Sequence, residues 1–159
     1  IHLTDLHVGN PDVPDSHLYS DTSTTFATIL ADIATLRPQP DFIVASGDLT
    51  NAGDVGSYEN IKKIFAASGL DMPVVWSLGN HDEREGFYRA MLGRDTDLDA
   101  PYFNDHVIAG VHIINLDSST PGSVGGTIEP EQFAWLETVL TTHSDRPKLL
   151  ISHQPPMPD

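Results

Sequence analysis

A short apolar run leads directly into a polar cluster in the stretch Phe42-Ile43-Val44-Ala45-Ser46-Gly47-Asp48-Leu49-Thr50-Asn51. Its first four residues are apolar and include β-branched side chains, a pattern that predicts a buried strand. Asp48 follows Gly47 directly after that strand, and its carboxylate offers two oxygens to ligands. The stretch therefore predicts a strand with a chemically useful side chain at its carboxyl end.

Amphipathic stretches flank this strand and alternate with further apolar runs. Apolar residues recur at helical spacing at Phe26, Ile29, Leu30, Ile33 and Leu36 and at Tyr58, Ile61, Ile64 and Phe65. We expect helices over residues 26–36, 57–69 (with Ser57 as N-cap), 84–93 and from Pro130, and strands at the N-terminus and over 42–45, 74–78, 107–108, 111–116 and 148–152. The order β-α-β-α-β-α-β-β-α-β predicts an α/β fold with a largely parallel sheet and one antiparallel pair.

A polar cluster ends each of four predicted strands. The four clusters are Thr4-Asp5-Leu6-His7, Gly47-Asp48-Leu49-Thr50-Asn51, Gly79-Asn80-His81-Asp82 and Ser152-His153-Gln154-Pro155-Pro156. Ligands of parallel α/β sheets bind beyond the carboxyl ends of the strands. We therefore expect the four clusters to converge on one site, and this convergence is a stronger signal than any one cluster.

Each cluster taken alone also has a structural interpretation. Asp5 and His7 are spaced to point to one side of an extended backbone as two ligands of one ion, but a loop Asp beside a hydrogen-bonded His gives the same pattern. Asp48 suits a ligand that bridges two metals and equally a helix cap or turn residue. His153, directly after an apolar strand, fits a metal ligand or a structural histidine.

The sequence Asn80-His81-Asp82 combines an amide with an imidazole and a carboxylate. The amide oxygen of Asn80 is a ligand for hard or borderline ions, although turns use the same residue. A carboxylate beside His81 would hold one tautomer and stabilise the charged form, which a general acid near neutral pH requires. The alternative is an ion pair in a surface loop.

Composition excludes several classes of function. The chain has 159 residues, 8 Lys and Arg against 23 Asp and Glu, a net charge of -15 and no Cys. Duplex nucleic acids are excluded as partners, because their recognition needs clustered basic side chains. Disulfides and thiolate sites are excluded, and no apolar run is long enough to span a membrane.

The calcineurin-like metallophosphoesterase superfamily has an ordered signature that this chain resembles at Asp5-x-His7, Gly47-Asp48-x-x-Asn51, Gly79-Asn80-His81-Asp82 and His153. The resemblance covers essentially the whole chain. The branch of class III cyclic nucleotide phosphodiesterases and glycerophosphodiesterases is similar at Leu116-Asp117-Ser118-Ser119, Gln132-Phe133-Ala134-Trp135-Leu136 and His153-x-Pro155-Pro156. That branch commonly doubles the His before the Pro pair, whereas Gln154 stands second here.

This resemblance implies a β-sandwich flanked by helices, with a two-metal site at the strand ends. The implied metal ligands are Asp5 and His7 on the first ion, Asp48 between both ions, and Asn80 and His153 on the second. His81, oriented by Asp82, would stabilise the phosphate or protonate the leaving oxygen. The ions would be Fe, Mn or Zn. The implied reaction is hydrolysis of small phosphodiesters, such as 3′,5′-cyclic nucleotides or glycerophosphodiesters. The implied nucleophile is a hydroxide that bridges the two ions.

Two alternatives stay open, and one of them depends on what this sequence lacks. The Gly-His-x-His motif that closes the site in the family does not occur in it. Both ends appear truncated, so we expect residues 1–159 to form a single partial domain, incomplete at the C-terminus, that alone binds substoichiometric metal and is weak or inactive. One alternative is that this fragment is a catalytically silent binding domain. The other keeps the superfamily and the class of reaction but changes the substrate, which makes the protein a phosphomonoesterase or phosphoprotein phosphatase. We expect a cytoplasmic protein and a homo-oligomer formed through the missing C-terminal part.

Overall fold

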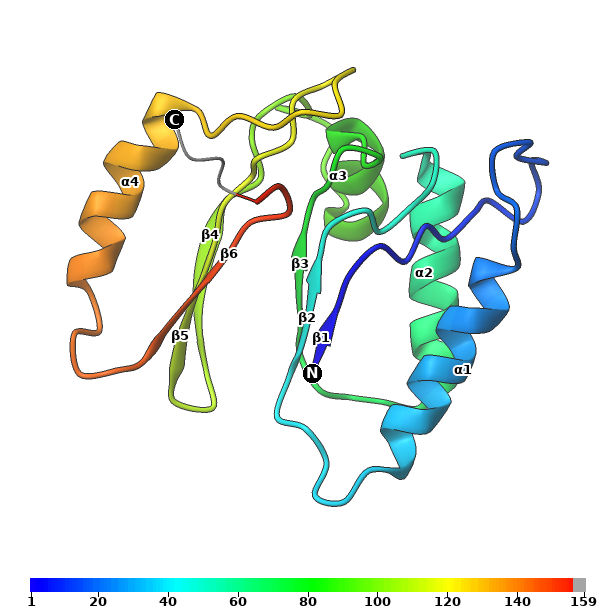
Figure 1. The fold of residues 1–159 in the computed structure, drawn as a ribbon, viewed down its shortest axis with the longest axis horizontal. Helices are drawn as coiled ribbons and strands as arrows, with labels where there is room; N and C mark the ends of the chain where they lie inside the picture. The colour runs from blue at the N-terminus through cyan, green and yellow to red at the C-terminus, as the bar shows by residue number, and fades with distance from the viewer. Residues whose placement is uncertain (156–159) are drawn as a thin grey trace.

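The N-terminal half of the chain alternates strands and helices. The computed structural model describes residues 1–155, and in it β1 (His2–Leu3), α1 (Thr22–Thr35), β2 (Ile43–Ser46), α2 (Val55–Ser68) and β3 (Val74–Ser77) follow one another. The three strands form a parallel sheet in the order β1-β2-β3. Val44 of β2 lies opposite His2 and Val75, so β2 is the central strand of this sheet (Figure 1).

The C-terminal half builds a second sheet. After α3 (Arg84–Leu92) come β4 (Asn104–Ile108), β5 (Val111–Asn115), α4 (Pro130–Thr141) and β6 (Lys148–Ile151). β4 and β5 are antiparallel, and Ala109 and Gly110 between them have φ angles of 50° and 83°, as a tight two-residue hairpin requires. β6 is parallel to β5. The predicted order of elements is confirmed, but the strands are divided between two sheets.

Capping residues explain where two helices begin. α1 begins earlier than predicted, because the carboxylate of Asp21 accepts a 2.9 Å hydrogen bond from the backbone N–H of Thr24. The prediction of Ser57 as the N-cap of α2 is wrong, since Asp54 caps this helix by accepting a 3.2 Å hydrogen bond from the Ser57 N–H. Gly69 follows α2 in the left-handed conformation that favours glycine.

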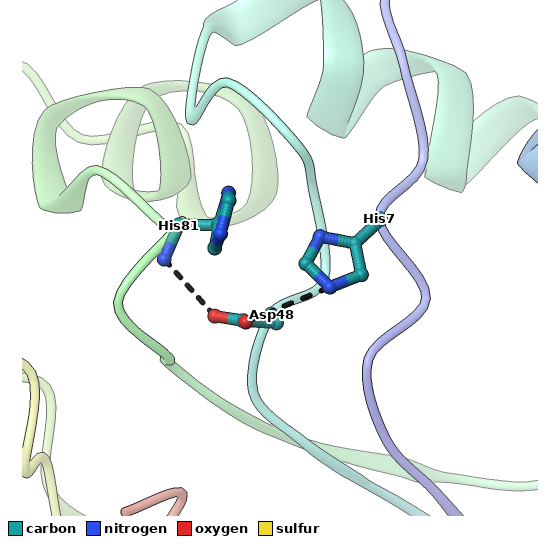
Figure 2. Close-up of side chains that lie close together, drawn as sticks. All are labelled: His7, Asp48 and His81. Carbon is teal, nitrogen blue, oxygen red and sulfur yellow. Dashed lines mark hydrogen bonds and ion pairs between the residues drawn. The ribbon is translucent and has the colours of Figure 1, made fainter. Parts of the chain in front are cut away.

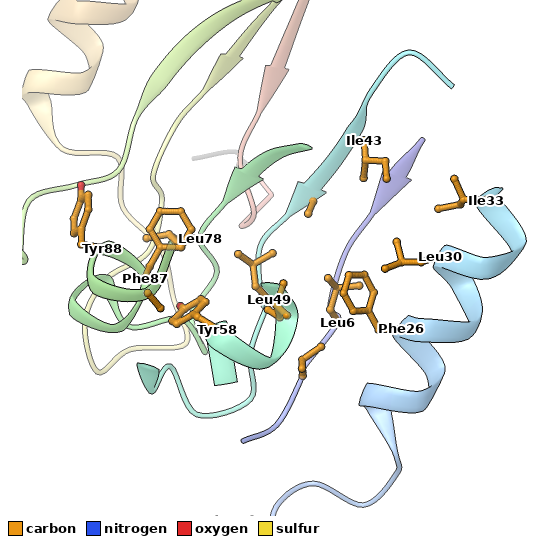
Figure 3. Close-up of a cluster of buried hydrophobic side chains, with 14 residues drawn as sticks. Leu6, Phe26, Leu30, Ile33, Ile43, Leu49, Tyr58, Leu78, Phe87 and Tyr88 are labelled. Carbon is orange, nitrogen blue, oxygen red and sulfur yellow. The ribbon is translucent and has the colours of Figure 1, made fainter. Parts of the chain in front are cut away.

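Two hydrophobic clusters hold the layers together. The larger fills the space between the first sheet and α1, α2 and α3, and its fully buried side chains include Leu30, Tyr58 and Phe87 (Figure 3). The smaller joins the two sheets and consists of Val44, Val75, Ile113 and Ile151. Burial of such side chains contributes about 1.5–3 kcal/mol each. The two sheets therefore stack as a sandwich, with α1 and α2 on one side and α4 on the other (Figure 1).

The β6 edge of the second sheet carries apolar side chains on the surface. Among residues 1–155, β6 pairs only with β5, and Leu149 and Leu150 are 39% and 53% exposed. These two side chains therefore belong to neither buried cluster. Within the described part of the chain, no helix has the length and apolar character that crossing a bilayer requires.

Candidate metal centre

The loops after β1, β2, β3 and β6 meet at one end of the molecule, as the four polar clusters predict. Two groups of side chains place their potential ligand atoms within 4.8 Å of one another. One group consists of His7, Asp48 and His81, and the other of Asp5, Asp48 and His153. Because both groups contain Asp48, the arrangement resembles two adjoining ion sites that share a carboxylate.

Asp48 occupies the centre of the cluster with its two oxygens directed to different histidines. Its Oδ2 lies 3.6 Å from Nε2 of His7, and its Oδ1 accepts a 3.0 Å hydrogen bond from the backbone N–H of His81 (Figure 2). Oδ1 also lies 3.4 Å from Nε2 of His153. Burial raises the pKa of Asp48, but the bonds from His153 and His81 outweigh it, so the pKa lies below its ordinary value. Asp48 is therefore a buried anion, beside the exposed side chains of Asp5 and His81.

Backbone carbonyls hold two of the histidines in one tautomer. Nδ1 of His153 lies 2.9 Å from the carbonyl of Ser46, and Nδ1 of His81 lies 2.9 Å from the carbonyl of Asn51. A carbonyl only accepts, so each Nδ1 carries a hydrogen and Nε2 is the nitrogen left for other partners. In metal-binding histidines of proteins, a hydrogen bond from the ring nitrogen that does not bind the metal orients the ring in the same way. The cluster thus presents nitrogen and carboxylate oxygen ligands without sulfur, a set that suits Fe, Mn or Zn.

The backbone is strained at three of the predicted ligands. Asp5, His7 and Asp48 have φ angles of 55°, 46° and 48°, in the left-handed region that side chains other than glycine rarely adopt. Each such residue costs on the order of 1–3 kcal/mol and persists only where its surroundings impose it. Strain at three residues whose side chains converge indicates that the chain is held in this shape for function.

Two glycines allow the loops to come this close. Gly47 has a φ of 101°, and a Cβ atom there would lie 2.5 Å from Nδ1 of His153. A Cβ atom on Gly79 would overlap the backbone nitrogen and Oδ1 of Asp48 and would lie 2.9 Å from Cδ2 of His153. Both glycines of the sequence motifs therefore leave room for the ligands of neighbouring loops.

Asp82 does not orient the imidazole of His81, contrary to our prediction. Its buried carboxylate accepts hydrogen bonds from the backbone N–H groups of Leu49, Thr50 and Gly79 and from the hydroxyls of Thr50 and Tyr58. Burial raises the pKa of Asp82, and these bonds oppose the rise. Asp82 is therefore a residue that ties the loop after β2 to the loop after β3, and the carbonyl of Asn51 orients His81.

Asn80 lies in the loop after β3, between Gly79 and the histidine of the first group. It lines a small cavity of about 120 Å³, together with Glu83 and Ser119 among others. It is half-buried. Its place beside the cluster is compatible with the predicted role as a ligand of the second ion, which stays a prediction.

A buried ion pair behind the cluster was missed by the sequence reasoning. Nε of Arg84, the first residue of α3, donates a 3.0 Å bond to Oδ2 of Asp117, whose side chain is 0% exposed. The Arg84 guanidinium also bonds the carbonyl of Ser119. Asp117 comes directly after the apolar run of β5, so the strand-end pattern that singled out Asp48 marks this residue as well. The pair connects the loop that carries His81 to the second sheet.

In the metal-free protein, we expect His153 to make stability depend on pH. Its hydrogen bond with Asp48 is the largest influence and raises its pKa from 6.5 to about 9, although burial opposes the rise. A pKa raised by folding adds stability that is complete below the unfolded pKa and is lost as the pH rises, here from about 6.5 to about 9. Urea denaturation with a chelator present should show this loss in the wild type and a flatter profile for His153→Gln.

The matched control for that experiment is the exposed His106 on β4, because His106→Gln removes a histidine far from the cluster. Its pH profile should follow the wild type. Identical profiles for His153→Gln and the wild type would show that the proton on His153 is not bound to Asp48 in the folded chain.

Comparison with known proteins identifies similar chains. A family model described as calcineurin-like phosphoesterase matches residues 1–157. A probable cyclic nucleotide phosphodiesterase of Rhodococcus erythropolis is 35% identical over 99% of this chain and 52% of its own length. The 3′,5′-cyclic adenosine monophosphate phosphodiesterase CpdA of Pseudomonas aeruginosa is 31% identical over 98% of this chain and 58% of its own length. The glycerophosphodiester phosphodiesterase GpdQ of Enterobacter lignolyticus is 28% identical over 99% and 56%. The chain therefore spans about half the length of these relatives.

Proposed function

The chain belongs to the calcineurin-like phosphoesterase family, and on this premise we propose that the protein hydrolyses small phosphodiesters at a centre that binds two metal ions. The names of the relatives, which are phosphodiesterases of cyclic nucleotides and of glycerophosphodiesters, support a diester as substrate. The net charge of -15 argues against substrates that basic side chains must hold, but a small anion bound by metal ions is compatible with it.

The observation that carries the proposal is the position of Asp48 in both groups of ligand atoms. A carboxylate whose oxygens face His7 and His153 separately is arranged to contact two cations at once. We propose Asp5 and His7 as ligands on one side of Asp48, and Asn80 and His153 on the other. Fe, Mn or Zn are the ions that such a set of ligands suits.

The residues around the centre have separate tasks in this proposal. Two bound cations would offset the charge of the phosphoryl group and lower the pKa of a water molecule. The hydrogen on Nδ1 of His81 is bound by Asn51, so a proton for the leaving oxygen comes from Nε2. Asp82 holds the two loops in place around the site through its hydrogen bonds, without touching the substrate.

We expect His81→Ala to lower kcat for bis(p-nitrophenyl) phosphate with added Mn(II) by about 10²–10⁴-fold, the usual contribution of a proton donor. The bound metal should stay unchanged, as elemental analysis after dialysis would show. This second measurement matters, because His81 also has a ring nitrogen close enough to the ligand atoms of His7 and Asp48 to act as a ligand. Loss of metal together with activity would assign His81 to the ligands instead.

The control variant is His106→Ala, which removes an exposed histidine on β4.

The same hydrolysis assay separates the alternative functions. Hydrolysis of p-nitrophenyl phosphate in preference to the diester would favour a phosphomonoesterase. No hydrolysis of either substrate by metal-loaded protein would favour a silent binding domain.

A further inference from the structure

A second cavity opens beside His81, on the side of the loop formed by residues 10–17. It has a volume of about 360 Å³, within the range of sites for small molecules. Its walls come from residues 10 and 13–17, from residues 51, 52 and 54, and from His81. His81 belongs both to this wall and to the group formed with His7 and Asp48. A diester with its phosphorus at the metal centre would therefore place one of its alcohols in this cavity.

The side chain of Asp15 gives the cavity its electrostatic character. Oδ2 of Asp15 accepts a 2.6 Å hydrogen bond from Nδ2 of Asn51, and Oδ1 accepts a 2.8 Å bond from the backbone N–H of His17. These bonds lower the pKa of Asp15, that from Asn51 most of all, so the group is an anion at neutral pH. The bonds also hold the carboxylate in place while each oxygen keeps a free lone pair.

Asp54, the other acidic side chain of the wall, already accepts hydrogen bonds from α2 and from Asn10. Asp54 accepts bonds from the N–H and hydroxyl of Ser57 and from Nδ2 of Asn10. No Lys or Arg is found among the described residues that line the cavity. Asp15 is therefore the carboxylate that a bound alcohol would meet. The groups of the wall that could offset its charge are the imidazoles of His17 and His81.

We propose that this cavity binds the alcohol of the diester and that Asp15 selects alcohols by charge, favouring ammonium or hydroxyl groups and disfavouring a further carboxylate or phosphate. The inference rests on the proposed function, because it assumes that the phosphorus lies at the metal centre. It narrows the substrate class to diesters of neutral or cationic alcohols, since a carboxylate attracts donors and repels anions.

The experiment compares glycerophosphoethanolamine with glycerophosphoserine, two diesters that differ by one carboxylate. Their binding to the ¹⁵N-labelled, Zn(II)-loaded full chain is followed by the amide shifts of Asp15 and Ala52, which does not require turnover. We expect the first to bind about three- to tenfold more tightly, as a partly exposed charge allows. In Asp15→Asn the ratio should fall towards one, mostly through tighter binding of glycerophosphoserine.

Asp12→Asn is the matched control, because it removes the same charge from an exposed residue of the same loop that does not line the cavity. It should keep the wild-type ratio. An unchanged ratio in Asp15→Asn, or no shift of the cavity amides with either diester, would overturn the proposal. If the wild type hydrolyses bis(p-nitrophenyl) phosphate but Asp15→Asn keeps the affinity ratio, only the selection by Asp15 is overturned. If the affinity ratio depends on Asp15 but the protein hydrolyses no diester, only the proposed reaction is overturned.

Discussion

We expect Asp48→Asn to lower kcat/KM for bis(p-nitrophenyl) phosphate by on the order of 10³-fold or more, because loss of a metal-bound charge costs several kcal/mol of transition-state stabilisation. The substitution keeps the size of the side chain and leaves an oxygen that can still accept the N–H of His81. It removes the charge that both histidines face and one of the two oxygens that would contact the ions. The loss of activity should therefore occur in a folded protein.

Elemental analysis and calorimetric titration with Mn(II) give the independent measurement. Because Asp48 belongs to both ligand groups, Asp48→Asn should lower the binding affinity for both ions. Loss of an outer ligand such as Asp5 should lower the affinity for mainly one ion. The control is Asp71→Asn, which removes an exposed carboxylate from the turn between α2 and β3. Wild-type metal content and activity in Asp48→Asn would disprove the shared role of Asp48.

The strand-end pattern predicts which loops come together because the physics behind it is local. A short apolar run followed by Gly47 and Asp48 indicates both a buried strand and the place where the chain leaves it. In a parallel sheet these places lie at one end, so the convergence of Asp5 and Asp48 follows without knowledge of their contacts. His153 follows β6 of the second sheet, so its arrival at the same place also depends on how the two sheets stack. The same pattern occurs at Asp117, two residues after β5 ends at Asn115. Asp117 pairs with Arg84, however, and belongs to neither group of potential ligands.

The roles of neighbours within a motif could not be predicted in the same way. His81 and Asp82 are adjacent in sequence, and the prediction that one orients the other assumed that their side chains meet. In the structure, Asp82 points into the protein towards Tyr58, while His81 bonds the carbonyl of Asn51, 30 residues away. Every residue has a carbonyl, so no residue type signals this contact. The division of the strands between two sheets is likewise a matter of packing between Val44 and Ile113.

Removal of one partner from the buried pair of Arg84 and Asp117 should destabilise the protein strongly. Asp117→Ala would leave a guanidinium that is 12% exposed without its carboxylate, and the N–H groups of Tyr102 and Ser119 without their acceptor. Breaking a buried pair by removing one partner costs about 3–5 kcal/mol. For a chain of this size we expect a fall in Tm of roughly 6–20 °C, measured by circular dichroism.

The exposed pair of Glu85 and Arg89 on α3 is the control, since it has the same charges in water. Glu85→Ala should cost about 0–1 kcal/mol, because solvent screens such pairs. Addition of Arg84→Met to Asp117→Ala should recover part of the lost stability, because it removes the uncompensated buried charge. Equal Tm values for Asp117→Ala and Glu85→Ala would show that Asp117 does not hold the loop of His81 to the second sheet. Since Asp117 lies behind the metal centre and contacts none of the ligands named above, a stable but inactive Asp117→Ala protein would contradict its structural role as well.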